Sequence, residues 1–304
     1  MERYYSFNRF LMERLGCRVY KVCVDAGFNC PNRDGTLSLS GCSFCNNDSF
    51  GPGRRLAGQS LEKQIEAGIQ KQRARTRVDS YLVYFQSFTN TYAPADRLKE
   101  LYSRALGCEG VIGLCIATRP DCLEDEVLEC LQALAERHFI LLELGLQSSH
   151  DRTLRAIHRG HDYGCFEQAV RKCQERQLAV SAHIILGLPG ETEEMMLTTA
   201  DRLAALPLDC LKIHDLHIVK ETALARSYLR DPFPLLSRQE YIHLLCRFLE
   251  RLPSRIAIER LFSSTPSSHL LAPDWAVNPG RLLEDIRREL ENQDTWQGRL
   301  LEEK

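Results

Sequence analysis

The chain has 304 residues, of which 44% are hydrophobic and 26% charged, so it can bury a large core and does not have the composition of a disordered protein. Its formal net charge of −2 excludes a global electrostatic field that would attract nucleic acid or an anionic membrane. Arg and Glu interrupt the apolar residues at the N-terminus, and no stretch approaches the roughly 18 uninterrupted apolar residues of a membrane span. The sequence therefore predicts a cytoplasmic protein with no membrane partner.

Apolar runs typical of β-strands recur along the chain, with helical patterns between them. Most of the runs are continuous rather than alternating, as in strands of a parallel sheet that is covered on both faces. The predicted strands are Arg18–Val24, Tyr81–Gln86, Val111–Thr118, Phe139–Leu146, Val180–Leu186 and Leu211–His214, with a weaker seventh at Arg255–Glu259. Six such units predict an α/β fold, a partial (β/α)6 barrel with right-handed crossovers.

Two of the intervening helices carry signals at their starts. Asp121 and Glu124 have the spacing of a capping box, and an apolar stripe follows between positions 123 and 134. Acidic residues crowd the start of the helix after the fifth strand, where they favour its positive end; they are Glu191, Glu193 and Glu194.

The best candidate for a domain boundary is the proline-containing stretch 231–234. Residues 1–230 are predicted to form the barrel. Residues 231–304 are predicted to form a C-terminal helical extension that packs on the barrel, with an amphipathic segment at 281–290.

Three of the thirteen cysteines, Cys30, Cys42 and Cys45, fall within sixteen positions directly after the first strand. In a parallel barrel this loop leaves the carboxyl end of the strand, where such folds place their chemistry. Two residues separate Cys42 from Cys45, so both thiolates can reach one metal or adjacent irons. A disulfide framework is disfavoured because the cysteine count is odd and the predicted compartment is reducing.

The three cysteines allow more than one type of site. Structural zinc takes four closed ligands, but the next cysteine is Cys108 and the next histidine is His138. Three cysteines suit a [4Fe–4S] cluster in which one iron stays open to a substrate or cofactor, and Phe44 would shield that cluster from water. The residues favour iron–sulfur over zinc, and buried structural thiols come third.

The spacing Cys30-x11-Cys42-x2-Cys45 resembles the signature of radical S-adenosylmethionine (SAM) enzymes. The resemblance covers the chain from about Tyr5 to Trp275. Six segments within it look like radical SAM proteins of the YhcC/YtqA type, which are related to the radical SAM portion of the Elongator catalytic subunit. The segments are CPNRDG (30–35), YFQSFTNTYAP (84–94), ATRPDC (117–122), ELGLQSSHDRTLRAIHRGH (143–161), LGLPGET (186–192) and KIHDLHIVKET (212–222). The resemblance implies a [4Fe–4S] cluster at the barrel mouth, SAM as cofactor, and reductive cleavage of SAM to a 5′-deoxyadenosyl radical that takes a hydrogen atom from the substrate.

The resemblance also assigns cofactor-binding residues. Gln86 stands where relatives present a glycine- and glutamate-containing segment to the SAM amino group. Glu143 and Gln147 are four residues apart, so they would share one face of a strand and reach the ribose or the methionine part of SAM. Arg159, expected on the following helix, would meet the SAM carboxylate, whereas the alternative is an exposed helix-end arginine.

Further candidates follow the third, fifth and sixth strands. Gly187 and Gly190 would let the backbone approach adenine. The alternative is that their segment, LGLPG at 186–190, is a common turn between a strand and a helix. Arg119 would orient SAM or substrate at the barrel mouth. No catalytic residue is assigned, and the candidates are His214, His217 and Cys122. Asp215 replaces the proline that the family usually has between the two histidines, which leaves the substrate open.

RNA binding has two readings in the sequence. Basic residues are densest at Arg54, Arg55, Lys63, Lys71, Arg73, Arg75 and Arg77, and the aromatics Tyr4, Tyr5 and Phe7 precede them. Together these could hold a single strand, but a solvated helix face is the more frequent explanation of such a run of charges. The resemblance favours tRNA as partner, because relatives act on the C5 side chain of the wobble uridine.

The resemblance implies a reducing electron donor such as flavodoxin or ferredoxin. Two alternative functions stay open. One is a radical SAM enzyme that acts on a small-molecule or porphyrin-like substrate, and the other is a zinc-stabilised RNA-binding module without catalysis. The sequence predicts no oligomeric state.

Overall fold

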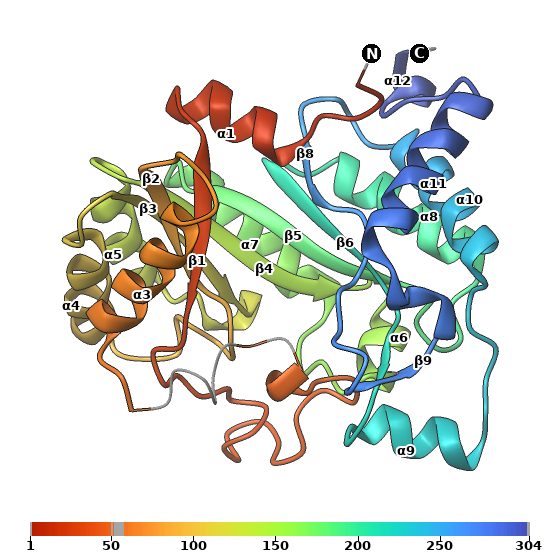
Figure 1. The fold of residues 1–304 in the computed structure, drawn as a ribbon. Helices are drawn as coiled ribbons and strands as arrows, with labels where there is room; N and C mark the ends of the chain where they lie inside the picture. The colour runs from red at the N-terminus through yellow and green to blue at the C-terminus, as the bar shows by residue number, and fades with distance from the viewer. Residues whose placement is uncertain (1, 50, 52–57, 303–304) are drawn as a thin grey trace.

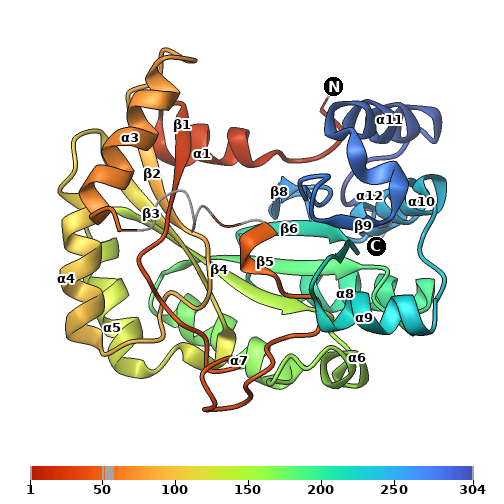
Figure 2. The same cartoon turned by 60° about the horizontal axis from the view of Figure 1, so that its bottom comes forward.

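Seven parallel strands form one curled sheet, an open half-barrel (Figures 1 and 2). The computed structural model describes residues 2–49, 51 and 58–302. The strands run in the order β1-β2-β3-β4-β5-β6-β8, and every neighbouring pair is parallel. Their bounds are β1 Val19–Val24, β2 Ser80–Phe85, β3 Val111–Thr118, β4 Phe139–Gln147, β5 Ala179–Leu186, β6 Cys210–Asp215 and β8 Ala257–Arg260.

All seven predicted strands are present, and β3 agrees at both ends. The prediction succeeds because the sheet is covered on both faces. In β3, the neighbours Leu114 and Cys115 point to opposite faces, yet neither side chain has any exposed surface. Leu114 packs in the outer hydrophobic cluster and Cys115 in the inner one. The α/β partial barrel is therefore confirmed, with β8 as its edge strand.

Helices cover the outer face of the sheet (Figure 2). They are α3 Leu61–Arg73, α4 Ala95–Leu106, α5 Asp125–Ala135, α6 Asp151–Ala156, α7 Tyr163–Glu175 and α8 Glu193–Ala204. Short 3-10 turns lie at η1 Asn47–Ser49 and η2 Pro120–Cys122. On α3, Leu61, Ile65 and Ile69 are buried, while the basic residues between positions 63 and 77 are exposed. The solvated-face reading thus accounts for this helix; Arg54 and Arg55 lie outside the described residues.

The predicted capping box at Asp121 is wrong. Helix α5 begins four residues later, with Glu124 at its N-cap and no side-chain capping bond. Asp121 instead pairs with Arg119, two residues before it. In α8 the cap is Thr192, whose side chain accepts from the Met195 N–H, and Glu191 lies before the helix.

Helix α1, Phe7–Leu15, lies across the amino ends of the strands (Figure 1). Phe7 and Leu11 are buried in the inner hydrophobic cluster, and the Tyr5 hydroxyl donates to Glu13. The N-terminal aromatics thus belong to the packing at this end of the barrel rather than to a surface on which bases could stack.

The C-terminal part adds helices to one side of the half-barrel (Figure 1). Its elements are α9 Ala223–Arg230, α10 Arg238–Leu249, η3 Asp274–Val277, α11 Pro279–Asn292 and α12 Arg299–Glu302, together with the antiparallel pair β7 Ile218–Val219 and β9 Leu270–Ala272. On α11, the predicted apolar side buries Leu282, Ile286 and Leu290. Within the described part of the chain, every helix is too short or too polar to cross a bilayer.

Candidate active site

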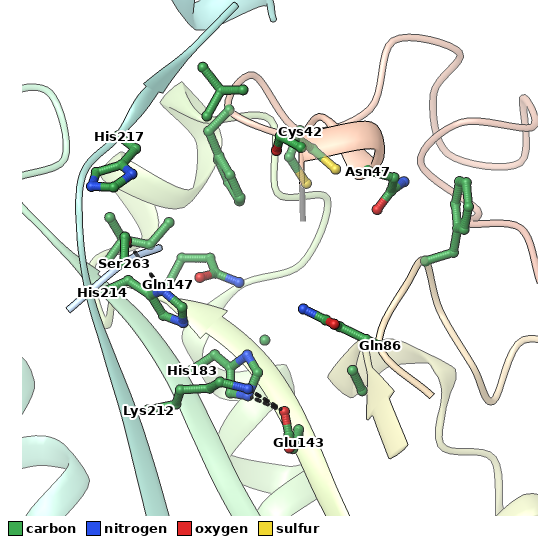
Figure 3. A pocket seen from close by; sticks show the side chains of 18 of the residues that line it. Cys42, Asn47, Gln86, Glu143, Gln147, His183, Lys212, His214, His217 and Ser263 are labelled. Carbon is green, nitrogen blue, oxygen red and sulfur yellow. Dashed lines mark hydrogen bonds and ion pairs between the residues drawn. The ribbon is translucent and has the colours of Figure 1, made fainter. Parts of the chain in front are cut away.

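A cavity of about 260 Å³ opens at the carboxyl ends of the strands (Figure 3). Its walls come from β2 to β6, from β8, and from the loop that follows β1. The three clustered cysteines line it, as do the predicted residues Gln86, Arg119, Glu143, Gln147, Arg159, His214 and His217. Side chains that lie up to 187 residues apart in sequence, from Cys30 to His217, therefore share one space.

The cysteine loop returns on itself as its turn residues predict. Gly41 has a positive φ of 73°, which glycine adopts without strain, and its N–H donates to Asn32 O at 2.7 Å. The Cys45 N–H donates to Cys42 O at 3.1 Å, so the last two cysteines sit in one tight turn. All three cysteines thereby reach the same cavity wall.

Ser43, between those cysteines, fastens the loop to two distant segments. Its N–H donates to Ile157 O at 2.9 Å, after α6, and its carbonyl accepts from the Leu224 N–H at 2.7 Å, in α9. The loop is thus fixed across the barrel mouth rather than hanging from β1.

Cys42 receives two buried hydrogen-bond donors. Asn32 Nδ2 lies 3.4 Å from Cys42 Sγ and also donates to His158 O at 2.7 Å. Arg159 Nη1 lies 3.5 Å from the same sulfur, and its Nε and Nη2 donate to Gly145 O at 3.2 and 2.5 Å. Such donors stabilise negative charge on a thiolate.

Arg159 is 6% exposed, so it is not an exposed helix-end arginine. It follows α6, which ends at Ala156, instead of lying on the helix. Arg119 holds the position of its main chain, because Arg119 Nη1 donates to Arg159 O at 2.9 Å. Asp121 orients Arg119 through a two-pronged pair at 2.9 and 2.7 Å.

The donor set fits a [4Fe–4S] cluster with one iron free of protein ligands. Desolvation, with Cys42 close by, raises the pKa of the Cys45 thiol to about 12, so a thiolate there needs a positive partner such as iron. The hydroxyls of Ser43 and Thr89 are buried without a partner among the described residues, and both lie beside this wall. Among those residues, no group of three or more His, Cys, Asp or Glu side chains is arranged to hold a single metal ion.

Gln86 and Gln147 point into the cavity between the cysteines and its inner end (Figure 3). Neither side chain bonds to another described residue, so both amides are free for a ligand. The spacing argument for Gln147 is wrong in its cause, because the β4–β5 register shifts between Gly145 and Gln147 and Gln147 has a φ of 81°. A left-handed turn, rather than strand alternation, brings this side chain into the cavity.

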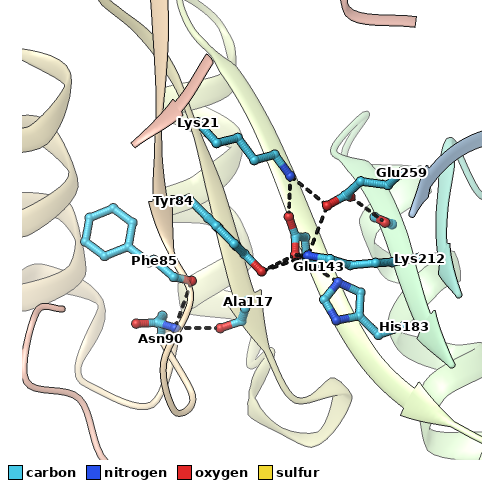
Figure 4. Close-up of polar contacts among 10 residues, drawn as sticks. Lys21, Tyr84, Phe85, Asn90, Ala117, Glu143, His183, Lys212 and Glu259 are labelled. Atoms are coloured by element: carbon cyan, nitrogen blue, oxygen red, sulfur yellow. Dashed lines mark hydrogen bonds and ion pairs between the residues drawn. The ribbon is translucent and has the colours of Figure 1, made fainter. Parts of the chain in front are cut away.

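Glu143 lies in a buried ionic network at the inner end (Figure 4). Its Oε1 accepts from Lys21 Nζ at 2.7 Å, and its Oε2 accepts from Lys212 Nζ at 2.9 Å and from the Tyr84 hydroxyl at 2.6 Å. Lys21 and Lys212 also reach Glu259, at 2.8 and 3.0 Å. Burial alone would raise the pKa of Glu143, but the two ammonium groups hold it well below the ordinary value. A contact with ribose would have to compete with these bonds.

Two histidines stand above this network. His183 Nε2 lies 2.8 Å from Glu143 Oε2, off the line of a straight N–H bond, and its ring is 6.0 Å from that of His214. His214 Nδ1 is 3.3 Å from Ser263 Oγ. Burial lowers the pKa of His183 and lowers that of His214 further, well below its ordinary value, so both rings are neutral at pH 7.

His217 is held by two partners from opposite sides. Its Nε2 donates to Asp215 Oδ2 at 3.0 Å, and its Nδ1 lies 2.9 Å from Thr265 Oγ1. Asp215, at the position where the family usually has proline, also accepts from the Ser263 N–H at 2.6 Å. The departure from the family pattern therefore forms part of the cavity wall.

Three of the predicted residues do not line the cavity. Cys122 is 8% exposed and lies outside the lining, and burial raises the pKa of its thiol to about 12. Gly187 and Gly190 have positive φ values of 86° and 80° and also lie outside it. The left-handed backbone of Gly187 (φ 86°), together with Leu236, which a Cβ would meet at 3.2 Å, accounts for this glycine without a ligand.

Sequence reasoning missed the ionic network and the hydroxyl of Thr89. Lys21 and Lys212 were charged residues inside apolar strands, and that departure from the apolar pattern was the available signal. Thr89 had no such signal, because its burial without a partner depends on how the loop after β2 folds.

Two family models match the chain. The radical SAM superfamily model matches residues 29–203, and the radical SAM C-terminal domain model matches residues 208–292. The chain is 38% identical over 301 residues to YtqA of Bacillus subtilis (strain 168), a match that covers 99% of this chain and 94% of YtqA. It is 36% identical over 278 residues to YhcC of Escherichia coli (strain K12), with 90% and 87% covered.

A more distant likeness extends to proteins that are named for tRNA. The chain is 27% identical over 176 residues to a tRNA uridine(34) acetyltransferase of Methanocaldococcus infernus, covering 57% of this chain and 32% of that protein. The solved structure of M. infernus Elp3 with an N-terminal deletion superposes with a TM-score of 0.69 at 18% identity, covering 92% of this chain and 64% of that chain, and so shares the fold. Because the superfamily model spans more than half of the residues and YtqA matches almost end to end, the chain belongs to the radical SAM superfamily of iron–sulfur, SAM-dependent enzymes.

Proposed function

We propose that this radical SAM enzyme modifies the C5 side chain of the wobble uridine in tRNA. The observation that carries the proposal is the convergence of the three loop cysteines, two unpartnered amides and a polar inner end on one cavity. The likeness to a tRNA uridine(34) acetyltransferase supports the choice of substrate.

Cys30, Cys42 and Cys45 would hold the cluster, with Asn32 and Arg159 donating to the Cys42 sulfur. When bound, the cluster and SAM supply the one-electron chemistry that removes a hydrogen atom from the substrate. The chain itself fixes the sulfurs through the Gly41 turn and the Ser43 anchors, and it buries Cys42 while Cys30 and Cys45 stay half-buried at the cavity wall. These are the positioning roles that the protein must supply.

Gln86 and Gln147 would bind SAM from facing sides of the cavity, and Thr89 would add a hydroxyl to that set. Arg119 would act through its hold on Arg159. Gly187 and Gly190, expected beside adenine, would approach it only through their backbone at the rim, since neither lines the cavity. Of the catalytic candidates, His214 and His217 would face the substrate, and Cys122 would serve the packing.

The size of the cavity limits how tRNA could enter. A space of about 260 Å³, part of which the cluster and SAM would fill, is too small for a helix, so only a single nucleotide could enter it. Anticodon bases are unpaired, and single-stranded bases can be splayed out into a pocket at a cost of a few kcal/mol. The enzyme would thus take the wobble base out of the anticodon stack.

The proposed enzyme would also need a domain arrangement, an electron donor and a cellular compartment that suit its chemistry. Residues 1–230 would carry the cluster and SAM site and residues 231–304 would form the extension, although β8 of the extension joins the barrel sheet through β6. A flavodoxin or ferredoxin would supply the electron. The enzyme would act in the reducing cytoplasm, a setting that the free thiols of the described cysteines support.

The test is mass spectrometry of tRNA nucleosides from cells that lack the gene, compared with the parent and with strains complemented by the wild type, Cys42→Ala or Cys17→Ala. We expect one modified uridine to be lost or to accumulate, with rescue by the wild type and Cys17→Ala but not by Cys42→Ala. An unchanged profile would refute the tRNA substrate and favour a small molecule.

A further inference from the structure

The cavity has an excess of positive charge. Among the described residues, and before the charge of the three cysteine thiolates is counted, two carboxylates, Glu143 and Asp215, face five cationic side chains: Arg33, Arg119, Arg159, Lys212 and Arg260. Both carboxylates already have partners in the chain: Glu143 accepts from two lysines, and Asp215 accepts from His217 and the Ser263 N–H.

Four of the five cations are also engaged. Arg119 pairs with Asp121, Lys212 reaches two glutamates, and Arg159 donates to Gly145 O and Cys42 Sγ. Arg33 lies over the Phe88 ring at 5.9 Å. Arg260 differs from them: within the part of the chain that the structure describes, its guanidinium has no hydrogen bond, ion pair or aromatic contact, although the residue is half-buried.

Arg260 ends β8 and stands beside Lys212 of β6, since the two are partners in the sheet register. It therefore lies at the inner end of the cavity, on the edge strand of the half-barrel. A second groove, which runs along α1 and β1, also borders it. Water in that groove could hydrate the guanidinium, which is the competing explanation for its lack of a partner.

His214 lies next to Arg260, and the positive charge of the guanidinium affects the pKa of its ring. After burial, the charge of Arg260 contributes most to lowering the pKa of His214, and His183, Lys212 and His217 add to it. The local potential is thus positive. Ser263 Oγ donates to Asp215 O at 2.7 Å, so it must accept from His214 Nδ1–H, and this leaves His214 Nε2 available to a ligand or a proton.

We propose that Arg260, with His214 beside it, forms a subsite for an oxyanion of the substrate at the inner end of the cavity. The guanidinium offers planar, paired N–H donors that match a carboxylate or a phosphate. The inference rests on the proposed function in that this cavity is the catalytic one. It adds that the substrate is anionic, through a carboxylate on the base or through a nucleotide phosphate.

Binding of three probes tests the subsite: uridine, 5-carboxyuridine and uridine 5′-monophosphate. Each is titrated calorimetrically into the anaerobically reconstituted holoenzyme with SAM present. We expect at least one anion to bind about tenfold more tightly than uridine, as for a charge-assisted hydrogen bond of about 1.5 kcal/mol. A gain with the carboxylate alone assigns the anion to the base substituent, and a gain with the phosphate alone assigns it to the nucleotide backbone.

Arg260→Gln should remove this preference and leave the uridine affinity unchanged, and Arg260→Lys should keep part of it. Arg226→Gln is the matched control, because this exposed α9 arginine carries the same charge outside the cavity. Equal affinities for all three probes, no binding of any, or a preference that survives in Arg260→Gln would overturn the inference and leave hydration as the explanation. The same samples are then reduced and assayed for release of 5′-deoxyadenosine. This assay tests the catalytic role of the cavity independently of the anion subsite.

Discussion

Replacing Glu143 by Gln tests the ionic network at the inner end of the cavity. The amide keeps the shape of the side chain but removes its charge, so Lys21 and Lys212 are left with the single carboxylate of Glu259. Three charge-assisted contacts of 2.6 to 2.9 Å lose their acceptor charge. Breaking a buried ion pair costs about 3–5 kcal/mol, and Glu143 is fully buried, so we expect a loss of that size.

The pH dependence of this loss follows from the direction of the pKa shift. The folded-state pKa of Glu143 lies well below its value in the unfolded chain, about 4.3. The carboxylate therefore adds stability at all pH values above the unfolded pKa, and this contribution fades as the pH falls toward the folded pKa. The difference between wild type and Glu143→Gln should be full at pH 7 and smaller below about pH 4.

The difference in the free energy of unfolding is measured by urea denaturation of the iron-free protein in reductant. Unfolding is followed by circular dichroism, once at pH 7 and once below about pH 4. Glu129→Gln is the matched control, because Glu129 is exposed on α5 and bonds to no other described residue. This control should change the free energy of unfolding by no more than about 0.5 kcal/mol. Equal midpoints for the two variants at pH 7 would refute the assignment of a strongly coupled buried network.

Three further predictions concern the wall that carries the cysteines. Cys42→Ala should abolish iron and sulfide binding, measured chemically after anaerobic reconstitution, whereas Cys17→Ala should keep the wild-type stoichiometry; full iron in both would exclude Cys42 as a ligand. Arg159→Gln should shift the cluster's midpoint potential to a more negative value in an EPR-monitored titration, because a donor to the Cys42 sulfur is weakened, and an unchanged or higher potential would contradict that contact. Thr89→Val should cost less than about 0.5 kcal/mol, because the buried hydroxyl has no partner among the described residues. Thr91→Val should cost about 1–2 kcal/mol, because it loses bonds to Thr118 and Cys122 O. Equal urea midpoints for the two valine variants would contradict this contrast.

The sheet could be predicted from the sequence because its strands are buried on both faces and read as continuous apolar runs. Helix starts were harder to predict. Asp121 has the right spacing for a cap, but Arg119 competes for the same carboxylate through two charge-assisted bonds. The local capping signal therefore lost to an ion pair two residues away, and the arginine of that pair is held by a tertiary bond to Arg159 O, which spacing does not encode.

The candidate site, like the fold, was predictable from the sequence only in part. The cysteine spacing favoured an iron–sulfur site, and its resemblance to the radical SAM signature, together with six segments, predicted the family, because such motifs are local in sequence. The direction of Arg159 was not predictable, since it depends on Gly145 O and Cys42 lying within reach after folding. Gln147 reached its predicted place through a left-handed backbone turn, an irregularity that strand periodicity does not describe.

The peptide groups on either side of Ser43 join the cysteine loop to the segment before Arg159 and to the first turn of α9. The mouth of the barrel is therefore a junction of three chain segments, and Cys42 and Cys45, the proposed ligands, lie on either side of its central residue. The position of the cysteines and the shape of the entrance are therefore coupled through one residue. A change that displaces Ser43 would move the cysteine loop, the segment before Arg159 and the start of α9 together.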